Sequence, residues 1–350
     1  MTVARELAEF LTGASPSDLP PQAVEHAAML IASTLASAAF GAGLESSGII
    51  RDLARERGGT PDASMWFHPG PKLPVADAAQ VNAVASDAAA SDDSDLRNIV
   101  HAGTTLVATA LAAAERTGAG GEDVLAAIVL GYEAAGRIGE AITPGFRTRG
   151  FHGCLVAIFA GAVAAGRLLG LDAPRMARAS ALSATSIGGL AAAANTSVAR
   201  EYHAGLAAML GVRAALAAQR GYLAEECILE VHHGFFEVYG GVEDASAGAS
   251  VTRDLGESWD IVTDMAIKLV PGGHPHHALA EAAGNAARDG RIAPDEVESI
   301  TLSRPDVTAL AGPRHPTDLI GMAHSPAFFL ACRRGRSWLL LGPRDTGKDR

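Results

Sequence analysis

The chain has 350 residues, of which 48% are hydrophobic and 5% aromatic, and its formal net charge is −11 at pH 7. This length and composition allow a large buried core and favour two domains over one. No basic block in the body of the chain offsets the negative charge, which argues against a nucleic acid or an anionic membrane as a partner.

The cysteines give no sign of a disulfide framework or a paired metal site. Cys154, Cys227 and Cys332 are odd in number and far apart, so we expect reduced thiols and a cytoplasmic protein. Residues 1–10 carry charges within their apolar run and lack the apolar core of a secretion signal. Charges or glycine clusters interrupt the longer apolar stretches, so we expect no membrane span.

The first 250 residues have the pattern of an all-α domain. Alanine is the strongest helix former, Pro20 and Pro21 suit a first helical turn, and glycines separate the segments. Small side chains also let helix axes approach closely. We predict a short extended piece at 63–67 and helices at 3–11, 20–39, 46–57, 75–90, 104–116, 122–141, 154–169, 173–190 and 205–218.

The pattern changes after Gly240 and Gly241. Residues 259–268 mix β-branched and polar side chains, 275–288 have helical spacing, and 297–303 alternate like a half-buried strand. We therefore predict a small, incomplete α+β domain at 251–331 beside the helical domain at 1–250. The fold class is mainly α. Residues 332–350 form an atypical tail with six Lys or Arg against two Asp.

One acidic segment stands out between two alanine-rich helices. Asp92 to His101 brings together three carboxylates, an arginine and a histidine. Unpaired charge is costly to bury, so the segment should face water or a ligand, and we interpret it as one wall of an active site. The alternative is a solvated connector in which Asp92 or Ser94 only caps the next helix.

Three further polar clusters lie beside predicted helices. The first holds His152 near a helix N-terminus, where backbone N–H groups can bind an anion. The second holds Arg200 and His203 just ahead of a helix, and the third runs from Lys268 to His277. A lone histidine beside a helix is more often structural, but the recurrence of the pattern favours a shared site.

The third cluster could also bind a metal through its histidines. It has no His-x-x-x-His pair with a nearby acid, and its prolines hold it in loop geometry, so we expect no metal there. The histidines concerned are His274, His276 and His277.

The order of these elements resembles the MmgE/PrpD family. The shared elements are an Asp-Asp loop ending in His101, Gly-Phe-His-Gly around His152, a cation three residues before His203, and Lys268 near His277. The resemblance extends from about residue 5 to about residue 330. The family includes 2-methylcitrate dehydratase, cis-aconitate decarboxylase and iminodisuccinate epimerase.

The resemblance implies a helical domain joined to a smaller α+β lid domain, a homodimer, a cleft between the domains and no organic cofactor. It matches Asp92 and Asp93 to the last two acids of an Asp-x-Asp-Asp-Thr segment. Three positions depart from the family: Ala90 replaces its first acid, Ser94 its threonine and Arg200 a cleft lysine. Arginine can clamp a carboxylate bidentately but is a poor proton shuttle.

The chemistry that the resemblance implies removes a proton next to a carboxylate while cations hold the developing enediolate. We predict that His101 and His152 are the acid/base pair and that Asp92 or Asp93 orients His101. Cations would clamp the small anionic carboxylate substrate, and other polar residues would line the cleft. The predicted clamps are Arg200 and Lys268, and the predicted wall residues are Ser94, Tyr132, His203 and His277.

The intermediate can lose water, lose carbon dioxide or regain a proton. We expect reprotonation, that is, an isomerase or epimerase acting on a dicarboxylate, because the departures remove an acid and a titratable lysine. A hydro-lyase of the 2-methylcitrate type or a decarboxylase of the cis-aconitate type is the alternative. A helical dimer without catalytic activity is a further alternative.

Overall fold

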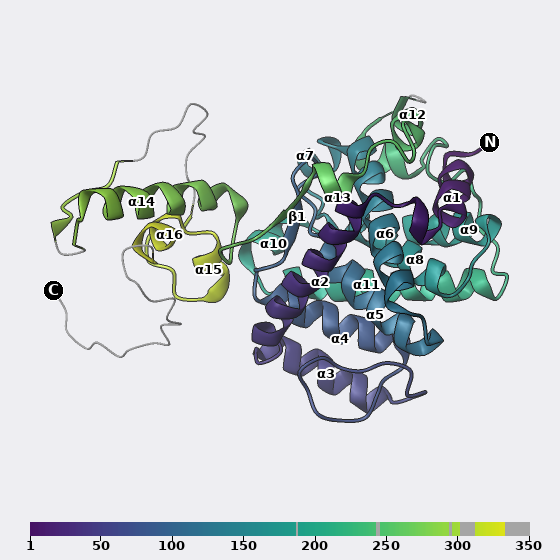
Figure 1. Cartoon of the computed structure of the whole chain (residues 1–350), viewed down its shortest axis with the longest axis horizontal. Helices are drawn as coiled ribbons and strands as arrows, with labels where there is room; N and C mark the ends of the chain where they lie inside the picture. Colours follow the sequence, from purple (N-terminus) through teal and green to yellow (C-terminus); the bar gives the residue numbers. More distant parts are fainter. Residues whose placement is uncertain (187, 243–245, 294–295, 302–311, 333–350) are drawn as a thin grey trace. The chain divides into compact units, whose positions relative to one another are not determined.

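The computed structural model describes residues 1–186, 188–242, 246–293, 296–301 and 312–332. The chain divides into two compact units, Met1–Pro271 and Gly272–Arg350 (Figure 1). The domain boundary predicted at residue 250 falls inside the first unit. Residues just after it belong there because they pack on helices and on a strand of that unit.

The first unit is mainly α, as predicted, and its helices follow the alanine-rich segments closely. Its single small sheet among the described residues pairs β1 (Asp93–Asp95) with β2 (Met265–Ile267). The helices are α1 Val3–Gly13, η1 Pro16–Asp18, α2 Pro21–Gly41, α3 Glu45–Arg57, α4 Val75–Ala88, α5 Ala102–Thr117, α6 Gly121–Ile142, α7 Gly145–Thr148, α8 Cys154–Leu168, α9 Ala173–Ala184, α10 Ala191–Thr196, α11 Ala199–Gln219, η2 Phe236–Gly240, α12 Ser246–Thr252 and α13 Asp260–Thr263.

Two predicted helix boundaries are wrong. The helix predicted at 173–190 ends at Ala184, ahead of Gly188 and Gly189, which lose the most backbone entropy in a helix. The helix predicted at 205–218 begins six residues earlier, at Ala199. Arg200 and His203 therefore lie in the first turns of α11 and not ahead of the helix.

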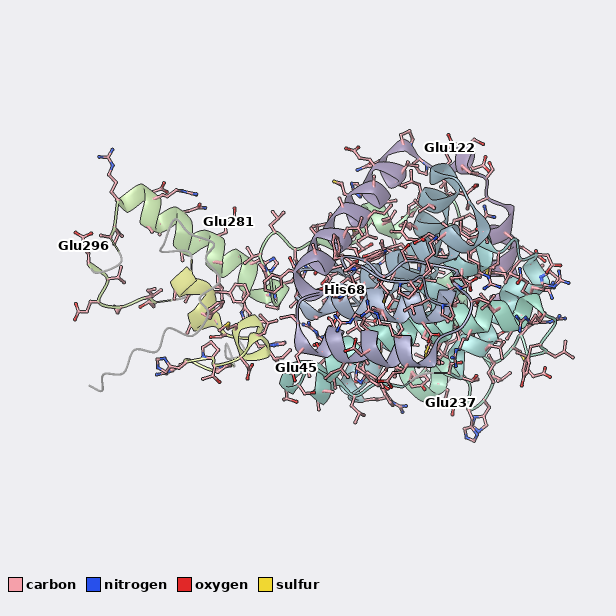
Figure 2. The ribbon with its side chains drawn as sticks, turned by 90° about the horizontal axis from the view of Figure 1, so that it is seen from below. Glu45, His68, Glu122, Glu237, Glu281 and Glu296 are labelled. Atoms are coloured by element: carbon pink, nitrogen blue, oxygen red, sulfur yellow. The ribbon has the colours of Figure 1, made fainter. Side chains whose placement is uncertain are left out.

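Helix α8 forms the centre of the first unit. Every residue from Cys154 to Gly166 is buried, and α8 packs against α5, α6, α9 and α11 (Figure 1). Charged residues near helix starts, such as Glu45 and Glu122, project to the outside instead (Figure 2). Alanine and glycine leave little side-chain volume between the central helices, so their backbones come close.

The small sheet was not expected from the sequence. β1 and β2 run antiparallel, with Asp93 opposite Ile267, Ser94 opposite Ala266 and Asp95 opposite Met265. β1 lies in the acidic segment, whereas β2 comes near the end of the first unit. The pairing therefore brings the acidic segment together with the residues just before Lys268.

The described part of the second unit contains only helices and loops. They are η3 (His274–His276), α14 (His277–Gly290), α15 (Leu319–Ala323) and α16 (Pro326–Cys332), and α14 packs on α16. The helix predicted at 275–288 is present. Residues 297–301 do not form the predicted strand, and 302–303 lie outside the described residues, as does the tail from 333 onward.

One helix, α2, is long and apolar enough by length and composition to cross a membrane. The buried core helices of soluble proteins can have the same length and apolar composition. In this structure α2 packs along α4, α5 and α6.

The close contact of α8 and α11 predicts a strong effect of one added methyl group. A Cβ on Gly211 would lie 2.9 Å from both the amide nitrogen of Ala162 and the carbonyl oxygen of Ile158. We expect Gly211→Ala to lower the free energy of unfolding by about 1–3 kcal/mol, measured by urea denaturation. Gly121→Ala is the control, because a Cβ there meets nothing within 4 Å. Equal stability of the two variants would contradict the close packing.

Candidate active site

The first four residues of the acidic segment are buried, contrary to the expectation that the segment faces water or a ligand, whereas Leu96 and Ile99 further along it are exposed. Asp92, Asp93, Ser94 and Asp95 are each at most 2% exposed. Buried charge is tolerated when it is paired and hydrogen-bonded. Asp92 and Asp93 accept hydrogen bonds from other parts of the first unit, whereas Asp95 accepts them from Arg97 and Asn98 of the segment itself. Residues 92–95 are therefore an organised part of the core.

Asp92 lies between a lysine and a histidine. The Lys268 ammonium group donates a hydrogen bond to Asp92 Oδ1 at 2.8 Å, and Asp92 Oδ2 lies 2.9 Å from His101 Nδ1. Burial alone would raise the pKa of Asp92, but the charges of Lys268 and His101 hold that pKa well below its usual range. The three side chains thus form a chain of contacts that begins at the buried Lys268 and Asp92 pair and ends at His101.

His101 occupies the residue just before α5, and its ring is held through one nitrogen. Nδ1 lies 2.6 Å from the carbonyl oxygen of Asp93 and 3.1 Å from Ser94 Oγ, in addition to the Asp92 carboxylate. These oxygens favour a proton on Nδ1, so Nε2 is the nitrogen that can exchange a proton with a substrate. The side chain is 26% exposed, so a ligand can reach it.

Asp93 has a structural role at the start of α5. Its carboxylate accepts hydrogen bonds from the Gly103 amide at 2.9 Å and from the Tyr132 hydroxyl at 3.1 Å. Burial and the charge of Asp92 raise its pKa to about 6. Asp93 is thus the capping acid that the alternative interpretation assigned to Asp92 or Ser94. It orients His101 through its main-chain carbonyl.

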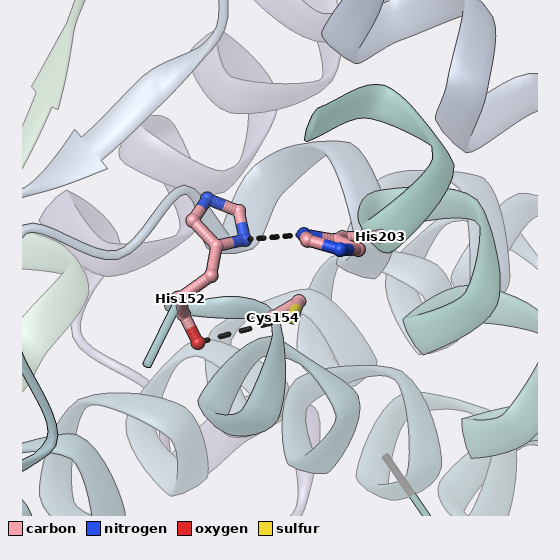
Figure 3. A group of neighbouring side chains, drawn as sticks. All are labelled: His152, Cys154 and His203. Atoms are coloured by element: carbon pink, nitrogen blue, oxygen red, sulfur yellow. Dashed lines mark hydrogen bonds between the residues drawn. The ribbon is translucent and has the colours of Figure 1, made fainter. Parts of the chain in front are cut away.

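The rings of His152 and His203 lie next to each other beside the start of α8, tilted by 42° with their centroids 5.2 Å apart (Figure 3). Their Nδ1 atoms are 3.3 Å apart, and the His152 amide donates to the carbonyl oxygen of Gly189 at 2.8 Å. Burial, followed by the charge of His101, lowers the pKa of His152 to about 3, and burial lowers the pKa of His203. Both imidazoles are therefore neutral at pH 7.

Arg200 is paired with an acid that the sequence analysis missed. Its Nε donates to Asp87 Oδ2 at 2.9 Å, and its Nη2 donates to the Asp87 carbonyl oxygen. Asp87 lies on α4, every residue of which is buried. An acid in an alanine-rich helix was the available signal, because a buried carboxylate needs a cation. The predicted role of Arg200 as a substrate clamp stays a prediction.

The predicted residues of the first unit form two neighbouring groups. One surrounds Asp92 and the other surrounds His152, and the charges of His101, Arg200 and Asp92 all act on His152. His277 lies in the second unit, where its ring is 6.2 Å from that of Phe329. The residues brought together in the first unit are Asp92, Asp93, Ser94, His101, Tyr132, His152, Arg200, His203 and Lys268.

The surface also has two open hollows away from these groups. One is lined in part by Arg178 and Cys227, and the other by Trp66 and Leu111. Neither is lined by a predicted site residue. The chemistry-bearing residues therefore do not coincide with these hollows.

A second ionic cluster fixes the acidic segment from the other side. Arg97 contacts Glu140 at 2.6 Å, Asp260 at 2.7 Å and also Asp264. Burial and the charge of Glu133 raise the pKa of Asp260 to about 8 in spite of Arg97. Arg97 thus ties the loop before His101 to α6 and α13.

Comparison with known proteins identifies the family of the chain. Residues 5–247 match the MmgE/PrpD N-terminal domain. The chain belongs to the MmgE/PrpD family. This confirms the resemblance inferred from the order of the polar clusters.

The curated relatives that match the chain include cis-aconitate decarboxylases. The chain is 29% identical over 280 residues to the cis-aconitate decarboxylase of Aspergillus terreus, covering 76% of this chain and 56% of that protein. It is 26% identical over 318 residues to the human cis-aconitate decarboxylase, covering 87% and 65%. A cis-aconitate decarboxylase-like protein of Aspergillus oryzae is 27% identical over 316 residues, covering 85% and 64%. The chain thus spans less than two thirds of the length of these relatives.

Two of the departures from the MmgE/PrpD pattern lie within this geometry. Ser94, in place of the family threonine, still places its hydroxyl within reach of His101. Ala90, in place of the family acid, is 2% exposed and adopts φ 52°. A carboxylate at position 90 would have to be accommodated in the core, so the alanine removes a charge from the surroundings of the Asp92 group.

The Lys268 and Asp92 pair predicts a large loss of stability when one partner is removed. Lys268→Met leaves a buried carboxylate without its cation, and we expect it to lower the free energy of unfolding by about 3–5 kcal/mol. Adding Asp92→Asn should restore part of this loss. The control is Lys72→Met, which breaks the exposed pair with Glu115 and should cost at most about 1 kcal/mol. A Lys268→Met variant no less stable than Lys72→Met in urea would contradict the buried pair.

Asp260 predicts a pH dependence of stability. The folded chain holds this proton up to about pH 8, whereas an unfolded Asp releases it near pH 4. The folded state thus binds the extra proton between these values, and the contribution of Asp260 to stability falls as pH rises from about 4 to 8. We expect Asp260→Asn to lose less stability than the wild type between pH 5 and 8 in thermal melts. The exposed Asp52→Asn variant should follow the wild type.

Proposed function

We propose that the chain is a cofactor-independent lyase that decarboxylates a small unsaturated tricarboxylate of the cis-aconitate type. The observation that carries the proposal is the buried Lys268, Asp92 and His101 chain, which ends in a ligand-accessible imidazole. The names of the matched relatives support decarboxylation. They do not support the epimerase outcome expected from the sequence, so we rank that outcome second.

His101 is the proton carrier of this proposal. Asp92 and the Asp93 carbonyl hold Nδ1, so the ring orientation and the tautomer are fixed before a substrate arrives. When Nε2 holds a proton, the resulting imidazolium is stabilised by the Asp92 carboxylate. Lys268 in turn keeps Asp92 ionised, because its charge opposes protonation of that carboxylate.

The proposed reaction breaks one carbon–carbon bond and forms one carbon–hydrogen bond. The electron pair of the bond to the departing carboxylate forms a new carbon–carbon double bond, the existing double bond shifts, and carbon dioxide leaves. The carbon at the far end of the shifted system takes a proton from His101 Nε2, and solvent returns a proton to the imidazole. Negative charge that develops on the neighbouring carboxylate is stabilised by the cations of the site.

His152 has a different role from the one predicted for it. With a pKa near 3 it stays neutral at physiological pH, so it serves as a neutral hydrogen-bonding wall and His101 alone carries the proton. Arg200 can use donors that Asp87 does not occupy, since a guanidinium has five N–H groups. Ser94, Tyr132 and His277 stay predicted wall residues, and the homodimer and the cytoplasmic location also stay predictions.

The assignment of His101 predicts a large kinetic effect. We expect His101→Ala to lower the rate of carbon dioxide release from cis-aconitate by about 10²–10⁴-fold, because a positioned acid/base group contributes that much. His232→Ala, which removes an imidazole 77% exposed at the surface, should keep the wild-type rate. Near-full turnover by a folded His101→Ala protein would refute the role of His101.

The same assay in D₂O separates the candidate outcomes. Decarboxylation gives carbon dioxide and a product with one new carbon–deuterium bond, whereas an epimerase places deuterium in recovered substrate without releasing carbon dioxide. Elimination of water from methylcitrate, followed by absorbance of the new double bond, would indicate the hydro-lyase. Absence of turnover with a panel of di- and tricarboxylates, together with no thermal stabilisation by any of them, would favour the non-catalytic alternative.

A further inference from the structure

We propose that His152, Cys154 and His203 form a binding site for a borderline-soft divalent cation such as Zn²⁺, and that the bound cation inhibits the enzyme. One ligand atom from each of the three side chains lies within 4.8 Å of the others (Figure 3). Two imidazoles and one thiol are a ligand set that Zn²⁺ prefers. Only the inhibitory part of this inference rests on the proposed function.

The separation of the two imidazoles suits a tetrahedral ion. Their Nδ1 atoms are 3.3 Å apart. Two nitrogens at 2.0–2.1 Å from a tetrahedral Zn²⁺ are about 3.4 Å apart, so the rings need to turn toward a common point but need not move apart. Cys154 supplies the third ligand from the first turn of α8, two residues after His152. Its thiol currently points to the His152 carbonyl oxygen at 3.8 Å.

Gly189 leaves the room that the site needs. A Cβ on Gly189 would lie 2.5 Å from Cys154 Sγ and 3.2 Å from His203 Nδ1. The backbone of residue 189 thus closes one side of the cluster, and a side chain there would occupy the space between two ligands. Gly189→Ala therefore tests the site without removing any ligand atom.

The surrounding charges include acids that favour a cation. The carboxylate of Asp87 acts electrostatically on both Cys154 and His203, and that of Asp92 acts on His152. His101 and Arg200 carry the opposing charges that act on His152. Binding would displace the thiol proton to solvent, and three protein ligands would leave a fourth position for water or a carboxylate.

Zn²⁺ bound at this site would use two imidazoles that line the proposed active site. A ring nitrogen bound to a cation cannot accept a hydrogen bond, so His152 and His203 would no longer serve as neutral hydrogen-bonding walls beside His101. We therefore expect Zn²⁺ to inhibit turnover reversibly, with activity restored by a chelator.

Co²⁺ binding to the full chain tests the site independently of turnover. A second trio, the exposed His232 and His233 with the half-buried Glu237, could bind metal too; Glu237 is labelled in Figure 2. The test therefore uses a His232→Ala, His233→Ala background. We expect a thiolate-to-cobalt absorption band and visible bands of tetrahedral Co²⁺. Cys154→Ser should abolish the thiolate band, and Cys227→Ser, the matched control at a cysteine outside the cluster, should keep it.

The remaining variants decide the ligand set. His203→Ala and Gly189→Ala should each weaken Co²⁺ binding by at least about tenfold, since even outer-shell changes cost 10–100-fold. Circular dichroism confirms that each variant is folded. A thiolate band that is absent from the background protein, or unchanged by Cys154→Ser, overturns the site. A normal thiolate band without inhibition by Zn²⁺ overturns the inhibitory role alone. If the chain has no activity but still shows the band, the proposed function is contradicted and the metal site is not.

Discussion

The contact between Lys268 and Asp92 determines how the candidate site is built. It joins side chains 176 residues apart in the chain, both almost fully buried. The pairing of β1 with β2 places the acidic segment beside the residues that precede Lys268. The Lys268 amide extends this pairing by donating a hydrogen bond to the Asp92 carbonyl oxygen at 3.3 Å. Because Asp92 also approaches His101, the orientation of the imidazole depends on the end of the first unit folding back onto the acidic segment.

The small residues of the helical body explain why its charges occur in pairs. Helices built from alanine and glycine pack closely and exclude water, so an isolated charge between them would be costly. Arg200 accordingly binds Asp87, and Arg137 lies 2.5 Å from Glu133 within α6. The site is therefore a set of mutually paired charges among small side chains, and a charge added or removed at one position alters the pKa values of the others.

The sequence predicted local structure well and long-range pairing poorly. Alanine-rich runs bounded by glycine and proline indicate helices by local rules, so most helices were placed within a few residues. The polar interruptions identified residues that do converge. The Asp-Ser-Asp strand β1 could not be predicted, because three polar residues have no strand pattern and their partner lies far along the chain. Asp87 was missed for the same reason, since its cation is 113 residues away.

In the proposed reaction, the negative charge of the substrate would change the protonation of the site. Lys268 and Arg200 already have carboxylate partners, so an incoming anion would share these cations with Asp92 and Asp87. A substrate carboxylate beside His101 would favour the imidazolium form of that ring, because a nearby negative charge stabilises the protonated state. Substrate binding would thus favour protonation of His101 at Nε2, and this is the proton that the reaction consumes. Carbon dioxide would leave as a neutral molecule, and the negative charge left on the substrate would be removed when His101 Nε2 gives its proton to carbon. The imidazole would thereby return to its neutral form.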